Sequence, residues 1–143
     1  RIITMKTILV LFTLFTALAP QSDLPASDLF VVVTSGDAET QMMAMVLATQ
    51  SMNQEVPVRI LLCSEAGELA VRSSESPSFA PANRSPKQLL SGLIERGAVV
   101  EVCGIFLPNR EYTADDLMEG VGMARPPEVA EYMRGEEVRY FTF

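Results

Sequence analysis

Residues 29–50 read LFVVVTSGDAETQMMAMVLATQ, and this stretch decides the class of fold. The run LFVVVT at residues 29–34 is uninterrupted, apolar and rich in β-branched side chains, which is typical of a parallel strand buried on both faces. Ser35-Gly36-Asp37 then predicts a tight turn in which Asp37 caps a helix over residues 38–53. A buried strand, a short turn and a helix form the repeating unit of an α/β protein.

Strand and helix continue to alternate toward the C-terminus. The best-marked helix has Ser85 as its N-cap, Pro86 at its first position, Gln88 completing a capping box, and Gly97 just past its end. This alternation predicts one domain over residues 27–143, with a parallel sheet and helices on both faces. A long irregular loop is expected at residues 73–83. The other predicted strands are 58–63, 98–103 and 138–143, and the other predicted helices are 65–71, 113–119 and 126–135.

The N-terminal residues have the layout of a secretory leader. Lys6 follows Met5, and residues 8–19 are apolar apart from two threonines. Twelve helical residues span about 18 Å, which is short of a bilayer core of about 30 Å, so a permanent membrane anchor is the weaker interpretation. We therefore expect residues 1–26 to comprise a few upstream residues plus a signal peptide. The mature domain is expected to be periplasmic or secreted, with no attachment to the membrane after cleavage.

Composition excludes several classes of function. The chain has 18 acidic and 11 basic residues, a net charge of −7, so nucleic acid is not an expected partner. Histidine is absent, which removes Ser-His-Asp and Cys-His catalysis and most zinc and iron sites. We expect no metal and no cofactor.

The two cysteines are the residues best suited to carry chemistry. Each stands at the end of a predicted strand, Cys63 after VRILL and Cys103 after AVVEV, and ligands of open parallel sheets gather at such ends. A sulfur carrier needs an accessible, partly ionised thiol with room for another sulfur atom, and Gly104 leaves room beside Cys103. The alternative is that either cysteine is simply a small buried hydrophobic residue.

Strand order decides whether the two cysteines can meet. If the second and third strands are neighbours, their ends lie about 5 Å apart and a disulfide is geometrically allowed; with a strand between them it is not. A structural disulfide would remove the relay hypothesis, whereas a reversible one would suit a redox role.

The stretch GAVVEVCGIFLPNREYTADDLMEGVGMARPPEVAEYMRGEEVRYFTF at residues 97–143, together with the first two strand-helix units, resembles the DsrE/DsrF family. The resemblance covers residues 28–143 and implies a three-layer α/β/α fold with a mostly parallel sheet of about five strands. It also implies a homo-oligomer and a sulfur relay in which Cys103, followed by Gly104, accepts a persulfide sulfur from a donor protein or a small sulfur species. Pro108 interrupts a segment that continues as helix in relatives, so the pocket around Cys103 is expected to differ in shape.

Weaker candidates complete the predicted site. Ser35 and Gly36 resemble an anion-binding turn, although a plain turn with a helix cap is the simpler interpretation. Arg110 lies in a predicted loop and could hold an anionic sulfur species. The function predicted first is an exported sulfur carrier. The alternative is a non-catalytic DsrE-like subunit that recognises a partner or small ligand and assembles through its helix faces.

Overall fold

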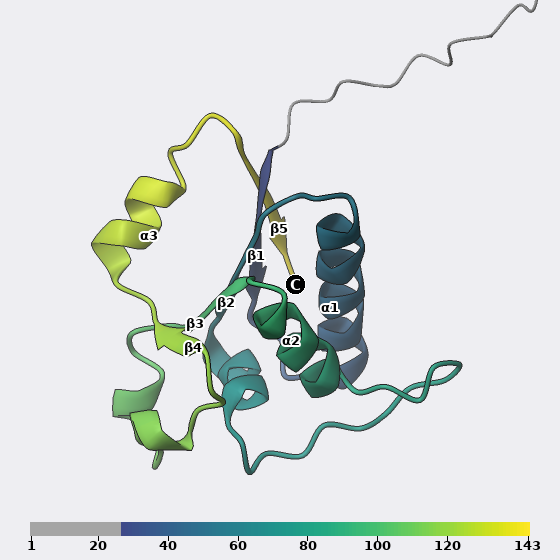
Figure 1. Ribbon diagram of the computed structural model, residues 1–143. Coiled ribbons are helices and arrows are strands. Elements are labelled where there is room, and N and C mark those ends of the chain that lie inside the picture. Colours follow the sequence, from purple (N-terminus) through teal and green to yellow (C-terminus); the bar gives the residue numbers. More distant parts are fainter. Residues whose placement is uncertain (1–26) are drawn as a thin grey trace, which may run out of the picture.

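The computed structural model describes residues 27–143, and the predicted signal peptide therefore lies outside the described residues. Strands and helices alternate along the domain, as the sequence predicts (Figure 1). None of the described helices is long and apolar enough to cross a membrane. The elements are β1 (Asp28–Val33), α1 (Ala38–Asn53), β2 (Val58–Leu62), η1 (Ser64–Ala70), α2 (Pro86–Glu95), β3 (Val99–Val102), η2 (Leu107–Asn109), η3 (Ala114–Asp116), β4 (Val121–Met123), α3 (Pro126–Tyr132) and β5 (Val138–Thr142), where η marks a 3-10 helix.

The five strands form one sheet in the order β4-β3-β2-β1-β5, and every neighbouring pair is parallel. The sheet confirms the predicted fold class. It also answers the question of strand order, because β2 and β3 are hydrogen-bonded neighbours.

Helices cover both faces of the sheet (Figure 1). Val33, Ile60 and Leu62 are fully buried in the larger core cluster, which they share with Met45 of α1 and Leu90 of α2. The opposite face carries a smaller cluster, in which Phe30 of β1 packs with Ala124 and with Val129 of α3. This division follows from the strand period of two, which sends successive side chains to opposite faces.

Two predicted helix starts are confirmed by their caps. The Asp37 side chain accepts a hydrogen bond from the Thr40 N–H at 2.8 Å. Ser85 and Gln88 form the reciprocal capping box of α2, with Pro86 at the start of that helix. Local side-chain chemistry fixed these boundaries, because the capping partners lie within three residues of one another.

The helix predicted over residues 113–119 is wrong beyond its first turn. A capping box starts a 3-10 turn there, but the turn ends at Asp116, and the short strand β4 follows at Val121. The reason is a distant partner: Leu117 forms an antiparallel bridge with Val71, and Arg72 donates its N–H to the Asp116 carbonyl at 2.9 Å. These backbone bonds replace the helical ones, and no local sequence signal announces them.

The loop between η1 and α2 is irregular, as predicted, but its first residues are held in place. The Lys87 ammonium donates hydrogen bonds to the carbonyl of Val71 at 2.6 Å and to the Ser74 hydroxyl at 2.7 Å. Burial lowers the pKa of Lys87, partly offset by the negative charge of Glu68. The loop is thus tied to the first turn of α2, while its far end extends away from the domain (Figure 1).

Candidate functional site

The two cysteines lie opposite one another, one rung beyond the paired ends of β2 and β3. Leu62 and Val102 are the last register partners of these strands. The ladder continues past them, because the Cys103 N–H donates to the Leu62 carbonyl at 2.8 Å and the Cys63 N–H donates to the Val33 carbonyl at 2.9 Å. Neighbouring strands lie about 4.8 Å apart, which lies within the Cα separation of disulfide-bonded cysteines.

Both cysteines are free and partly buried, and both are placed on the face of the sheet that α3 covers. Leu62 and Val102 are fully buried on the other face, among α1 and α2 side chains. Side chains alternate along an extended backbone, so the next residue of each chain points the opposite way. Two of the sequence-predicted residues, Cys63 and Cys103, are therefore brought together.

The fold disfavours ionisation of the Cys63 thiol. Burial raises the pKa of Cys63 to about 12, and the neighbouring Cys103 side chain adds to the rise. At neutral pH Cys63 keeps its proton. Since the thiolate is the nucleophile, Cys63 is a poor attacking thiol at neutral pH.

Cys103 opens onto a small apolar pocket between the sheet and α3. The cavity has a volume of about 220 Å³. Its walls carry no charged side chain, so an occupant would be held by apolar contact. The lining residues are Leu61, Cys103, Gly104, Ala124, Pro126, Val129, Ala130 and Met133.

Gly104 allows the chain to pass close to the segment that follows β4. A Cβ atom at this position would stand 3.0 Å from the Ala124 carbonyl oxygen and 4.0 Å from the Pro126 ring. The Ala124 N–H in turn donates to the Val102 carbonyl at 2.8 Å. The glycine predicted from the sequence therefore lies in the pocket wall, where its small size keeps the wall near Cys103.

Phe106 anchors the turn after Cys103, and sequence reasoning missed it. Its N–H donates to the Cys103 carbonyl at 2.8 Å, and its side chain is only 3% exposed. The ring lies against Gly67 of η1, where an added Cβ would be 2.3 Å from two ring carbons. No spacing rule links residues 67 and 106, so only the folded chain shows this contact. Pro108 lies in the one-turn 3-10 helix η2 that follows.

Ser35 and Gly36 form the turn between β1 and α1. The Ser35 hydroxyl accepts from the Asp37 N–H at 3.1 Å, and its carbonyl accepts from the Gln41 side chain at 2.9 Å. Gly36 packs against Glu65, whose Cβ would stand 2.9 Å from an added Cβ. These contacts are those of a helix-capping turn, and the anion-binding role remains a prediction.

Arg110 follows η2 and makes its contacts with η1 and Phe106. Its guanidinium pairs with the Glu68 carboxylate at 3.6 Å and lies 5.5 Å from the centre of the Phe106 ring. These partners hold the turn that follows Cys103, and the proposed role in binding an anionic sulfur species remains a prediction.

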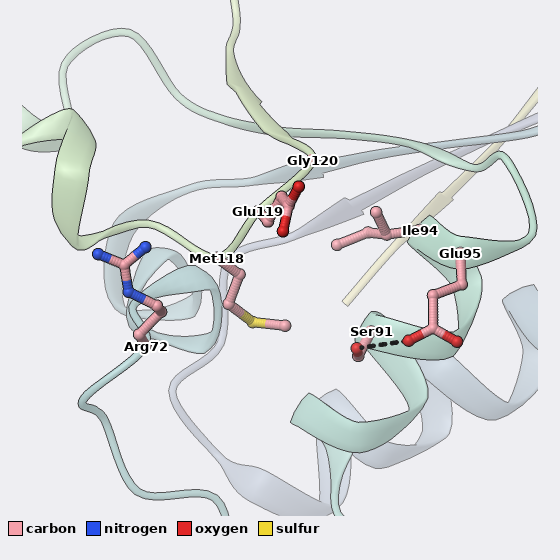
Figure 2. A pocket seen from close by; sticks show the side chains of 7 residues that line it. All are labelled: Arg72, Ser91, Ile94, Glu95, Met118, Glu119 and Gly120. Atoms are coloured by element: carbon pink, nitrogen blue, oxygen red, sulfur yellow. Dashed lines mark hydrogen bonds between the residues drawn. The ribbon is translucent and has the colours of Figure 1, made fainter.

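A larger groove of about 560 Å³ lies elsewhere, between α2 and the segment leading into β4 (Figure 2). The guanidinium of Arg72, which lines the groove, donates one hydrogen bond to the Leu117 carbonyl at 2.9 Å and another to the Asp115 carbonyl. On the α2 side, Ser91 donates to the Glu95 carboxylate (Figure 2). The groove lies where α2 ends and β4 begins, away from the carboxyl ends of β2 and β3, and neither cysteine lines it.

Within residues 27–143 no three cysteine or carboxylate side chains cluster in a way that could hold a metal ion.

Comparison with known proteins supports the fold. No model of a known protein family and no curated protein matches the chain. Among solved structures, the ychN protein from E. coli is similar, with a TM-score of 0.68 and 20% identity over 80% of this chain and 99% of that one. The protein of unknown function MTH1491 from Methanobacterium thermoautotrophicum is similar with a TM-score of 0.58 and 19% identity, over 80% of this chain and 96% of that one. At these identities the likeness concerns the fold alone, and it supports the α/β architecture with a five-stranded parallel sheet.

Proposed function

We propose that this protein is a sulfur carrier in which Cys103 accepts a sulfane sulfur and passes it on as a persulfide. The observation that carries the proposal is the position of Cys103: a free thiol at the carboxyl end of a central strand, facing a pocket with room for further sulfur atoms. The resemblance to the DsrE/DsrF family and the DsrE-like fold both favour this use of a strand-end cysteine. Export of the mature domain to the periplasm or beyond is part of the same proposal.

The pocket also indicates what kind of donor would suit the site. A cavity of about 220 Å³ with apolar walls accommodates a few heavy atoms and offers no side-chain charge to pair with an inorganic anion. A small organic persulfide fits better than thiosulfate, because its alkyl group gains from burial while its sulfur meets Cys103.

The transfer step needs no cofactor. The Cys103 thiolate attacks the outer sulfur of the donor R–S–SH, forming a new S–S bond as the donor's own S–S bond breaks. The products are Cys103–S–SH and the thiolate RS⁻. The outer sulfur keeps its oxidation state, so no external oxidant or reductant is consumed.

Intact-mass spectrometry tests this step. Reduced Cys63→Ser, which retains Cys103 as the only cysteine, is mixed with one equivalent of an alkyl persulfide. It should gain about 32 Da, the mass of one sulfur atom, and Cys103→Ser should show no such gain. If Cys63→Ser does not form the adduct, the proposed function is wrong.

A second candidate function is that of an assembly subunit, because apolar side chains are exposed on one side of the domain. Met43 and Leu47 on α1 are 54% and 42% exposed, and Phe141 on the edge strand β5 is 50% exposed. Leu47 and Phe141 together line a shallow groove of about 210 Å³. We propose a second copy of this chain as the occupant, since the family resemblance implies a homo-oligomer. Light scattering should then show an oligomer at micromolar concentration and a monomer for Met43→Glu/Leu47→Glu. A monomeric wild type would contradict this assignment.

A further inference from the structure

We infer that Cys63 is a resolving thiol, which discharges the Cys103 persulfide as hydrogen sulfide and leaves a disulfide between the two cysteines. This inference rests on the proposed function, because it requires that Cys103 first carries the sulfur. It adds an activity to that function: sulfane sulfur would leave the protein as sulfide when no acceptor takes it.

The first support is the distance between the two residues. The Leu62–Val102 register and the hydrogen bond from the Cys103 N–H to the Leu62 carbonyl at 2.8 Å place Cys63 directly across from Cys103. The two side chains share a face of the sheet, and both thiols are free. A disulfide can therefore form without moving either strand.

The second support is the pocket in which a persulfide would lie. Ala124, Pro126 and Val129 of the β4–α3 segment line it together with Leu61 of β2, and Cys63 is not among its lining residues. An outer sulfur held in this pocket leaves the inner sulfur at Cys103, directly across the β2–β3 ladder from Cys63. Attack by Cys63 on the inner sulfur then releases the outer sulfur into the pocket.

The step balances without another reactant. The Cys63 sulfur attacks the inner sulfur of the Cys103–S–S⁻ persulfide, and its proton passes to the outer sulfur as that sulfur departs. A Cys63–Cys103 bond forms, the bond to the outer sulfur breaks, and HS⁻ leaves. The outer sulfur gains two electrons and the two cysteines lose two. An external dithiol is needed only to reduce the disulfide for a further turnover.

The high pKa of Cys63 fits this order of events. A thiol that stays protonated at neutral pH is a poor nucleophile toward a free donor. Attack on the neighbouring Cys103 persulfide is favoured instead by proximity, and the departing sulfur takes up the proton. A high-pKa thiolate is also the stronger nucleophile once it is formed.

A single-turnover reaction under anaerobic conditions tests the inference. Reduced wild-type protein, freed of reductant, receives one equivalent of an alkyl persulfide, and both sulfide and intact protein mass are followed. The wild type should release about one equivalent of sulfide and end about 2 Da lighter, as a disulfide. Cys63→Ser and Cys63→Ala should both retain the gain of about 32 Da and release no more sulfide than Cys103→Ser.

The outcomes separate the two proposals. If the wild type keeps the added sulfur as firmly as Cys63→Ser and releases no sulfide, the resolving role is wrong and the carrier function stands. If Cys63→Ser does not take up sulfur at all, the carrier function fails and the resolving role fails with it. Sulfide release by the wild type together with retention by both Cys63 variants establishes the inference.

Discussion

Replacing Gly67 by alanine should strain the turn that presents Cys103. The added Cβ would stand 2.3 Å from Cδ2 and Cε2 of Phe106 and 2.8 Å from its Cγ. Ordinary contacts between carbon atoms are about 3.5–4.0 Å, so the ring must move by more than 1 Å. Phe106 is 3% exposed and has no open side toward which to move freely. Overpacking of this kind costs about 1–3 kcal/mol, which corresponds to a fall in Tm of about 4–12 °C for a domain of this size.

The matched control is Gly92→Ala in the interior of α2. No atom lies within 4 Å of the Cβ that this change adds, and alanine favours helix over glycine, so stability should be unchanged or higher by up to about 1 kcal/mol. Thermal unfolding followed by circular dichroism gives both values. The rate at which Cys103 reacts with a thiol dye should rise in Gly67→Ala alone, because the Phe106 N–H holds the Cys103 carbonyl. Equal stability of Gly67→Ala and wild type would refute the packing argument.

Four further predictions concern individual contacts. Burial and the charge of Cys103 raise the pKa of Cys63 to about 12, so iodoacetamide at pH 9 should alkylate Cys63 on the order of a hundredfold more slowly than an ordinary thiol. Cys103→Ser should reduce this difference in alkylation rate without abolishing it. Peptide mass mapping measures both rates. The Cys63 thiol ionises above about pH 9 in the unfolded chain but stays protonated in the folded one. Its contribution to stability is therefore intact below pH 9 and is lost as the pH rises toward 12. Over this range the urea midpoint should fall further in the wild type than in Cys63→Ala, and an equal fall in both would contradict this. The Arg59 guanidinium lies 2.7 Å from the Glu101 carboxylate, and both side chains are 14% exposed. Glu101→Gln removes the counter-charge of Arg59 and should destabilise the fold by about 2–4 kcal/mol in urea unfolding. Arg59→Met/Glu101→Leu should recover most of that loss, because it removes both charges. Ser85→Ala should cost about 1 kcal/mol by removing the α2 cap, and Ser85→Asp should restore much of it in the same assay.

The candidate site divides into a part that the sequence predicts and a part that it does not. Cys63 and Cys103 each end an apolar β-branched run, and such a run predicts a central parallel strand whose carboxyl end faces the ligand side of the sheet. The residues that surround Cys103 could not be predicted in this way. Gly67 packs against Phe106, and Ala124 lies beside Gly104, so each acts on a residue near Cys103 from a distant part of the chain. Local patterns carry no signal for contacts of this kind.

The sequence by itself determined strands β1, β2, β3 and β5, their parallel arrangement and the caps of α1 and α2. These features depend on the polarity of neighbouring residues and on hydrogen bonds that span three or four positions. Only the tertiary structure decided that β2 lies beside β3, that the helix predicted over residues 113–119 ends at Asp116 and strand β4 follows, and that the β4–α3 segment forms a wall of the pocket at Cys103. Each of these depends on backbone hydrogen bonds and packing between residues far apart in the chain, whose energies are set by the whole fold and not by any single segment.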